Sequence, residues 1–301
     1  MRAIFGSDNR VIKKLRLFWG KKGYLFVIPS IAWVFLFTIF PLLYSLRISF
    51  YATWYGKLTK FIGLKNYGRL IGDYRFWSAI RVTLIFVTIT VLATIALGMI
   101  LALIFNRKMQ GVRFFRGLFC MPLFTAPVAL GYLGVMIFYE EAGPINTLVE
   151  ALGLAKIPWL SQSGWAMVAV CLVDIWQWTP FVFLVLLAGL QSLPEEIYEA
   201  ALLDSSSSWD IFRYVTFPLI APVLGTVTIL RIVEAFKVFD IPFSLTNGGP
   251  GIATRTLTYY AYVQGLRNLD LGYGAAMSYV LLAMMLVVSI IFFSRYSKMY
   301  E

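Results

Sequence analysis

The sequence predicts an all-α integral membrane protein with six transmembrane helices, and composition is the first observation behind this prediction. Hydrophobic residues make up 60% of the 301 residues and charged residues only 14%. So little polar surface cannot cover a soluble globule of this length. The second observation is that four windows without any charged residue exceed the ~18 residues that indicate a membrane span. Two further apolar stretches contain only isolated charges.

The six predicted spans follow from these stretches. The windows without charge cover residues 23–46, 82–106, 117–139 and 271–294. A fifth apolar region, about 164–193, is interrupted only by Asp174. The last region starts at Tyr214 and stays free of charge up to Leu230.

The spans form one predicted domain. No low-complexity linker and no internal repeat divides the chain, so we expect a six-span membrane domain at 24–301 after a basic segment at 1–23. The first apolar window is longer than the core of a cleaved signal peptide, and Arg47 and Tyr51 stand where a cleavage site of small residues would follow. We therefore expect this window to be a span.

The distribution of Lys and Arg predicts the orientation. Residues 1–23 contain seven basic residues and the connection 107–116 contains four, and such clusters beside spans mark the cytoplasmic side. Six spans then place both termini and residues 194–213 in the cytoplasm. The opposite connection, 47–81, also contains seven basic residues, so the bias is moderate. Since the basic residues are dispersed, the net charge of +11 indicates topology rather than nucleic-acid binding.

Several kinds of chemistry are disfavoured. The chain has no histidine, which excludes imidazole catalysis and most zinc sites. Cys120 and Cys171 lie inside apolar runs, where cysteine behaves as a small hydrophobe. No G-x-x-x-x-G-K-[ST] motif is available to hold nucleotide phosphates. A membrane enzyme is therefore a weak alternative.

A polar, acid-containing segment separates two apolar runs. It reads EAALLDSSSSWDIFRYVTFPL from Glu199 to Leu219. Ser192 with Glu195, and Ser207 with Asp210, each fit the capping box that begins a helix, so two short helices are expected around it. Pro218 is expected to end the preceding helix, where the fifth span begins.

Three strings of the sequence form a recognisable set. The polar segment has Glu-Ala-Ala at 199–201, then Asp204, and closes at Pro218; the other two strings are GLKNY at 63–67, with Phe76 and Trp77 beyond it, and LTNGGPGIATRT at 245–256. The polar segment resembles the ATPase-docking loop of permease subunits in binding-protein-dependent ABC importers. The other two strings resemble the carbohydrate-importer branch of that family, which includes maltose, glycerol-phosphate and oligosaccharide permeases. Where the family usually has glycine after the aspartate, this chain has Ser205, which lacks glycine's freedom at positive φ.

The resemblance implies the type I importer permease fold and a multi-pass protein of the bacterial cytoplasmic (inner) membrane. It implies a second homologous permease subunit, two cytoplasmic ATPase subunits, an external substrate-binding protein and surrounding membrane lipid as partners. ATP and Mg would be bound by the ATPase, so the chain itself would be no enzyme and bind no cofactor. The docking loop, at about 194–218, would use Glu199, Ala200, Ala201, Asp204, Ser205 and Pro218.

Charged residues inside predicted spans need an explanation, because each costs ~2.5–3.5 kcal/mol at a helix centre. Asp174 and Arg231 reach similar depths when residues are counted from opposite ends of consecutive spans, so they can pair. The resemblance also places a set of residues along the substrate path. These are Asp174, Gln177, Trp178, Phe181, Arg231, Glu234 and Ala235.

The sequence leaves alternatives open for these residues. One is a structural ion pair between Asp174 and Arg231, with Trp176 and Trp178 as packing. The other is a sugar site, in which aromatic faces and polar groups bind the ligand. Arg231 would suit an acidic oligosaccharide or a polyol phosphate, whereas Glu234 disfavours anions. A rival function is a secondary transporter that moves a proton or sodium ion through Asp174 and Glu234.

Overall fold

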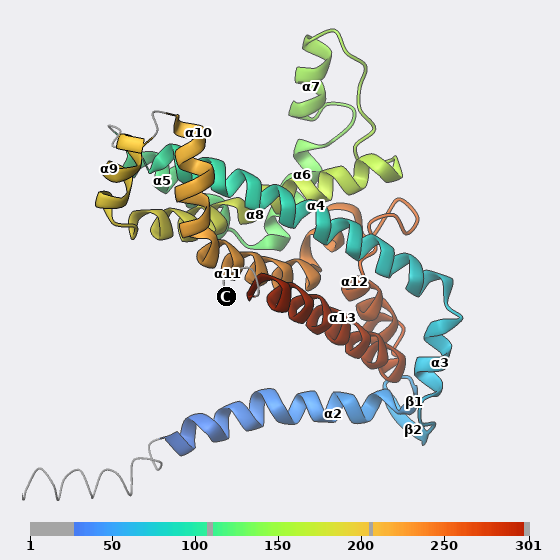
Figure 1. The fold of residues 1–301 in the computed structure, drawn as a ribbon. Coiled ribbons are helices and arrows are strands. Elements are labelled where there is room, and N and C mark those ends of the chain that lie inside the picture. Colours follow the sequence, from blue (N-terminus) through green and yellow to red (C-terminus); the bar gives the residue numbers. More distant parts are fainter. Residues whose placement is uncertain (1–26, 107–110, 205–206, 298–301) are drawn as a thin grey trace, which may run out of the picture.

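The computed structural model describes residues 27–106, 111–204 and 207–297, and the described chain is mostly helical (Figure 1). The predicted basic segment 1–23 and Ser205 lie outside these residues. Five described helices are long and apolar enough to cross a membrane: Val27–Ser49, Tyr74–Phe105, Ser163–Gln191, Ser208–Phe236 and Leu271–Tyr296. They agree with five of the six predicted spans.

The remaining predicted span, 117–139, is not one straight helix. Its residues fall into α5 (Val112–Cys120), the 3-10 turn η2 (Met121–Phe124) and α6 (Pro127–Ile137). The two halves meet at 100°, and together they supply the sixth apolar element. Pro127 explains the break, because a proline disfavours helical backbone at the residue before it, and Ala126 is extended with ψ of 130°.

The other elements are short helical pieces within or between the long helices, and one hairpin. In chain order, the structure contains η1 (Phe35–Ile39), α2 (Phe40–Ser49), β1 (Tyr51–Trp54), β2 (Lys57–Phe61), α3 (Lys65–Ile71), α4 (Tyr74–Phe105), α7 (Pro144–Ala151), α8 (Ser163–Gln191), α9 (Glu195–Asp204), α10 (Ser208–Ile211), η3 (Phe212–Thr216), α11 (Phe217–Phe236), η4 (Pro242–Thr246), α12 (Leu257–Tyr262), η5 (Val263–Arg267) and α13 (Leu271–Ser297). The antiparallel hairpin β1–β2 is a small departure from the predicted all-α fold.

The core lies where α4, α8 and α11 pack against one another. Phe86, Phe183 and Phe236 are among its fully enclosed side chains. The helices α4 and α8 approach closely at Gly98, where an added Cβ would lie 2.5 Å from Val182 Cγ1. Small residues allow such close approach between membrane helices.

The first long helix stands apart from this bundle (Figure 1). The most apolar window of Val27–Ser49 contains no buried residue. Its described contacts with the bundle lie toward its end, where the hydroxyls of Ser45 and Tyr279 are 3.1 Å apart and those of Ser49 and Tyr67 are 2.9 Å apart. The chain alone therefore leaves most of this apolar helix uncovered.

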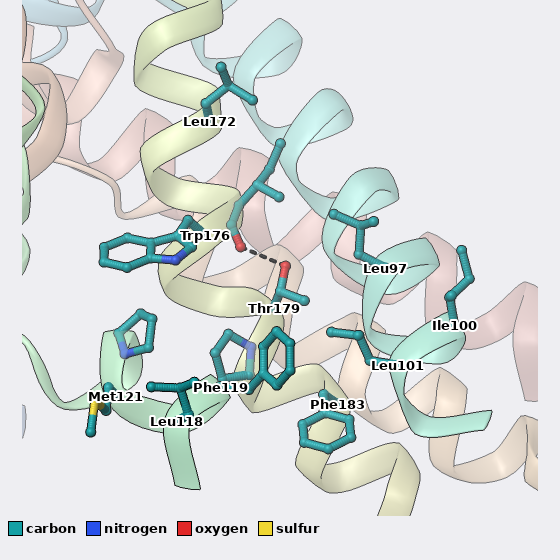
Figure 2. Close-up of a pocket in the computed structure, with 13 residues that line it drawn as sticks. Leu97, Ile100, Leu101, Leu118, Phe119, Met121, Leu172, Trp176, Thr179 and Phe183 are labelled. Carbon is teal, nitrogen blue, oxygen red and sulfur yellow. Dashed lines mark hydrogen bonds between the residues drawn. The ribbon is translucent and has the colours of Figure 1, made fainter. Parts of the chain in front are cut away.

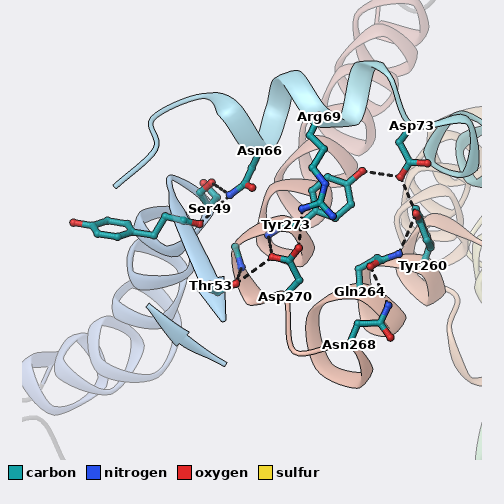
Figure 3. A network of polar contacts seen from close by, with 12 residues as sticks. Ser49, Thr53, Asn66, Arg69, Asp73, Tyr260, Gln264, Asn268, Asp270 and Tyr273 are labelled. Carbon is teal, nitrogen blue, oxygen red and sulfur yellow. Dashed lines mark hydrogen bonds and ion pairs between the residues drawn. The ribbon is translucent and has the colours of Figure 1, made fainter. Parts of the chain in front are cut away.

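A polar network fixes the end of the bundle at which α4 begins (Figure 3). Asp73 Oδ2 accepts hydrogen bonds of 2.7 Å from the hydroxyls of Tyr260 and Tyr273. Arg69 forms a 2.8 Å ion pair with Asp270. These contacts join the α3–α4 corner to α12 and α13.

Candidate functional site

A buried ion pair joins α8 to α11. Arg231 Nη2 donates to Asp174 Oδ2, and the two side chains are 0% and 2% exposed. The predicted pairing of these residues at matching depth is confirmed. Neither charge could be held away from water without a partner of this kind.

Arg231 also contacts the neighbouring aromatic side chain of α8. Its guanidinium carbon lies 5.2 Å from the centre of the Trp178 ring, within cation–π range. Phe181 meets the edge of Trp178, with ring centres 5.9 Å apart. The Nε and Nη1 atoms of Arg231 are buried and have no hydrogen-bond partner among the described residues.

A cavity of about 250 Å³ opens beside this pair. Its lining combines carboxylates, an amide, an ammonium group and aromatic rings. The lining residues are Pro127, Asp174, Gln177, Trp178, Glu234, Lys237, Val238, Phe239, Asp240 and Ile241. They come from the start of α6, the middle of α8, the end of α11 and the segment that follows α11.

Two of the polar lining residues are held by neighbours. Gln177 Nε2 donates to the carbonyl of Thr125 at 3.2 Å, at the break between η2 and α6. Its Oε1 atom is buried without a partner in the described chain. Glu234 forms a 2.7 Å ion pair with Lys237. The cavity lining thus includes one neutralised charge pair, and the Gln177 amide beside it keeps a buried oxygen without a partner in the described chain.

The structure brings together only part of the predicted substrate-path set. Asp174, Gln177, Trp178 and Glu234 line the cavity. Arg231 lies behind Asp174, and Phe181 contacts Trp178 without lining the cavity. Ala235 is fully buried in the core cluster, so it does not reach the cavity.

Trp176 lies in a different place from the one expected beside Asp174 and Arg231. It is 52% exposed and lines a separate, almost wholly apolar pocket of about 590 Å³ between α4, α5 and α8 (Figure 2). The reason is the helical period, because residues two apart on an α-helix point to nearly opposite faces.

Six lining residues were missing from the predicted set: Pro127 and the run 237–241. Lys237 caps α11, Phe239 lies in the break that follows, and Asp240 begins the helical turn that leads into η4. The sequence signal for two of them was charge, because Lys237 and Asp240 stand at the end of the apolar stretch that forms α11. Their orientation into the cavity depends on where the chain leaves the helix, which the apolar pattern does not specify.

The segment that resembles a docking loop contains two short helices, α9 and α10. Ser207 caps α10, where its hydroxyl oxygen accepts from the Asp210 amide at 3.3 Å, as the predicted capping box requires. Ser192 does not form its predicted box. It ends α8 and donates to the Gly189 carbonyl at 2.7 Å, and α9 begins after Pro194.

The predicted helix end at Pro218 is wrong. The chain stays helical from Ser208 to Phe236, and Pro218 is the second residue of α11. The π-helical turn η3 directly precedes α11, and this wider turn accommodates a residue that cannot donate a backbone hydrogen bond.

The docking-loop residues of α9 differ in exposure. Glu199 and Ala200 are exposed, and Ala201 is half-buried. Leu202 and Leu203 are 62% and 89% exposed. The backbone of Asp204 ends α9, while its side chain and Ser205 lie outside the described residues. Within the described parts of α9 and α10, acidic and apolar side chains therefore share one solvent-accessible surface.

The described residues contain no group of three His, Cys, Asp or Glu side chains that could hold a metal ion. The cavity instead offers hydrogen-bond acceptors beside aromatic faces. Such a lining binds a polar ligand without covalent chemistry.

Comparison with known proteins gives the context for this architecture. Residues 94–297 match the family described as binding-protein-dependent transport system inner membrane component. The trehalose/maltose transport system permease protein MalF of Thermococcus litoralis is 34% identical, over 95% of this chain and 97% of its own length. The lactose transport system permease protein LacF of Rhizobium radiobacter is 34% identical, over 93% of this chain and 95% of its own length.

The fold has a close counterpart among solved structures. A chain of a bacterial ABC transporter involved in the import of the acidic polysaccharide alginate superposes with a TM-score of 0.83. It is 21% identical, with 96% of this chain and 100% of that chain covered. The match is therefore one of fold, the type I ABC importer permease fold. On the family match and these relatives, the chain belongs to the inner membrane components of binding-protein-dependent transport systems.

Proposed function

We propose that this chain is the transmembrane permease subunit of an ATP-driven importer for a carbohydrate, and that the cavity beside Asp174 and Trp178 forms part of the substrate path. The observation that carries this proposal is the polar, aromatic cavity at the ion pair between α8 and α11. The relatives named for trehalose, maltose and lactose support a carbohydrate cargo.

The lining suits a sugar. The rings of Trp178 and Phe239 can cover the apolar C–H faces of a pyranose, while its hydroxyls need hydrogen-bond acceptors. Asp174, Glu234 and Asp240 line the cavity and supply such acceptors, and the Gln177 amide lies on the same lining. A purely structural ion pair would not need these additional groups around an open space.

Energy for transport would come from partner subunits. The chain lacks a phosphate-binding loop, so two cytoplasmic ATPases would bind ATP and Mg and hydrolyse the ATP. The exposed surface of α9 and α10 would dock on them. A second homologous permease subunit and lipid would cover the uncovered helix Val27–Ser49. An external binding protein would deliver the cargo.

The mechanism would be alternating access. Closure of the ATPases on ATP would move α9 and α10, and α10 continues without interruption through η3 into α11. Since α11 carries Arg231 and Glu234, a tilt of this helix would change the cavity directly. Hydrolysis would then restore the original arrangement.

The test is uptake by the complete complex, reconstituted in liposomes with its binding protein. We expect uptake of a labelled carbohydrate to require internal ATP and to continue when an uncoupler removes the ion gradient. A catalytically inactive ATPase subunit is the matched control and should abolish uptake. Uptake that stops with the uncoupler and ignores ATP would establish the secondary transporter instead.

A further inference from the structure

We propose that this cavity selects neutral saccharides and discriminates against acidic ones, because Asp174 and Trp178 screen Arg231 from the ligand. The inference rests on the proposed carbohydrate function and specifies its substrate class. The solved structure of similar fold belongs to an importer of an acidic polysaccharide. At 21% identity the fold is shared and the charge of the cargo is decided by individual residues.

The first step is the position of Arg231. Its side chain is 0% exposed and does not line the cavity, whereas Asp174 and Trp178 both do. Asp174 accepts the Nη2 hydrogen bond, and the ring of Trp178 lies 5.2 Å from the guanidinium carbon. A carboxylate in the cavity would therefore meet Asp174 and the indole before it could reach Arg231.

The second step is the net charge of the other groups that line the cavity. Lys237 is the cation among the lining residues, and Glu234 already pairs with it at 2.7 Å. Asp240 also lines the cavity, and its carboxylate has no partner among the described residues. At and beside the cavity, the three carboxylates of Asp174, Glu234 and Asp240 outnumber the two cations, Arg231 and Lys237. The site therefore has an excess of one negative charge.

The third step is the effect on a ligand. A sugar carboxylate would lose water without gaining a free cation and would be repelled by Asp240. Neutral hydroxyl groups can donate to the carboxylates on the cavity lining, above all to Asp240. The same groups therefore favour a neutral saccharide and oppose a uronate of the same size.

The experiment measures direct binding of matched sugars to the purified complex of permease and ATPase subunits. The probes are neutral oligosaccharides of two to four units and uronate oligosaccharides of the same lengths. Isothermal calorimetry measures the affinity of each probe for the complex. We expect wild-type complexes to bind the best neutral probe at least about tenfold more tightly than the best uronate.

Two variants test the cause. Asp240→Asn removes the unpaired carboxylate without touching the buried pair, and it should raise the ratio of uronate to neutral affinity about tenfold. Asp174→Asn should raise the same ratio, because it removes the negative charge that neutralises Arg231. Glu150→Gln is the control, since Glu150 lies on α7 outside the cavity and pairs with Lys156 at 3.7 Å. It removes an equal charge and should leave the ratio unchanged.

The outcomes separate the two proposals. A wild-type preference for uronates overturns the neutral selectivity while the carbohydrate function stands. A ratio that Asp240→Asn fails to change, in a complex that elutes as the intact assembly, also overturns it. Absence of binding by every saccharide, with wild-type ATP hydrolysis intact, overturns the carbohydrate function and this inference together.

Discussion

Asp73 shows how a single residue connects distant parts of this chain. Its Oδ1 accepts from the Arg75 amide at 2.9 Å and caps α4, while its Oδ2 receives the hydroxyls of Tyr260 and Tyr273 (Figure 3). Burial alone would raise the pKa of this carboxyl. Hydrogen bonds from Tyr273, Tyr260 and the backbone amides outweigh burial, so its pKa lies below the ordinary 3.8.

Replacement of this carboxylate should have a stability effect that depends on pH. Asp73→Asn should lower the free energy of unfolding by about 1–3 kcal/mol at pH 7, because charge-assisted hydrogen bonds are lost. A lowered folded-state pKa stabilises the protein above the unfolded value of 3.8. That contribution disappears as pH falls through the lower folded value. Denaturant unfolding of wild type and variant in detergent should therefore converge in acid.

The control for this prediction is an exposed acid. Glu141→Gln removes a carboxylate that is 77% exposed and lies 3.6 Å from Lys156. Such a pair is worth little, so its stability difference should be small at every pH. A difference for Asp73→Asn that stays constant down to the lowest pH would contradict a role for the ionised carboxylate.

The two short helices expected around the docking segment are present as α9 and α10, although the predicted box at Ser192 and helix end at Pro218 are not. Ser207 begins α10, and α9 carries an exposed leucine pair beside its acids. Exposed leucines on a short polar helix are costly to leave in water unless another protein covers them. This element is where we expect the ATPase to bind.

Replacement of one leucine tests this surface. Leu202→Glu should weaken assembly with the ATPase at least about tenfold, since a buried apolar contact would become a buried charge. Leu154→Glu is a matched control, because both leucines are 62% exposed and Leu154 follows α7, far from α9 along the chain. Co-purification of the ATPase with tagged permease measures the effect. Equal recovery of ATPase with the two variants would place the docking surface elsewhere.

The whole molecule is incomplete as a single chain. The helix Val27–Ser49 extends from the bundle without a buried residue in its apolar window, and the α5–α6 halves meet at 100° (Figure 1). Apolar surfaces of this size are stable only in lipid or against another helix-rich subunit. The arrangement agrees with the inner membrane family to which the chain belongs.

Orientation is a property of the whole molecule and can be tested by labelling. We expect both termini and the α9–α10 segment in the cytoplasm, because the basic clusters lie at 1–23 and 107–116. Single cysteines at the exposed Ser208 and Ser163 should react with an impermeant maleimide from opposite sides of the membrane. The native Cys120 and Cys171 are buried and serve as the background. Labelling of both positions from one side would contradict the six-span topology.

The sequence by itself determined the membrane class and the position of five long helices, and it indicated Arg231 as a candidate partner for the buried charge of Asp174. Each follows from the large free-energy cost of placing a charged or polar group in the membrane. Long windows without charge favour membrane spans, and a charge inside a span is costly unless a counter-charge lies at a similar depth, which Arg231 offers to Asp174 on the next span. The cap at Ser207 was equally local.

Only the tertiary structure decided the path of the third apolar stretch and the direction in which the site residues point. Pro127 accounts for the break in the helix, whereas the 100° angle depends on the packing of α6 against its neighbours. The screening of Arg231 likewise depends on Asp174 and Trp178 lying between it and the cavity. Hydropathy measures the cost of a residue in the membrane. It contains no information on which groups lie between a charge and an open space, because that order is set by the packing of separate helices.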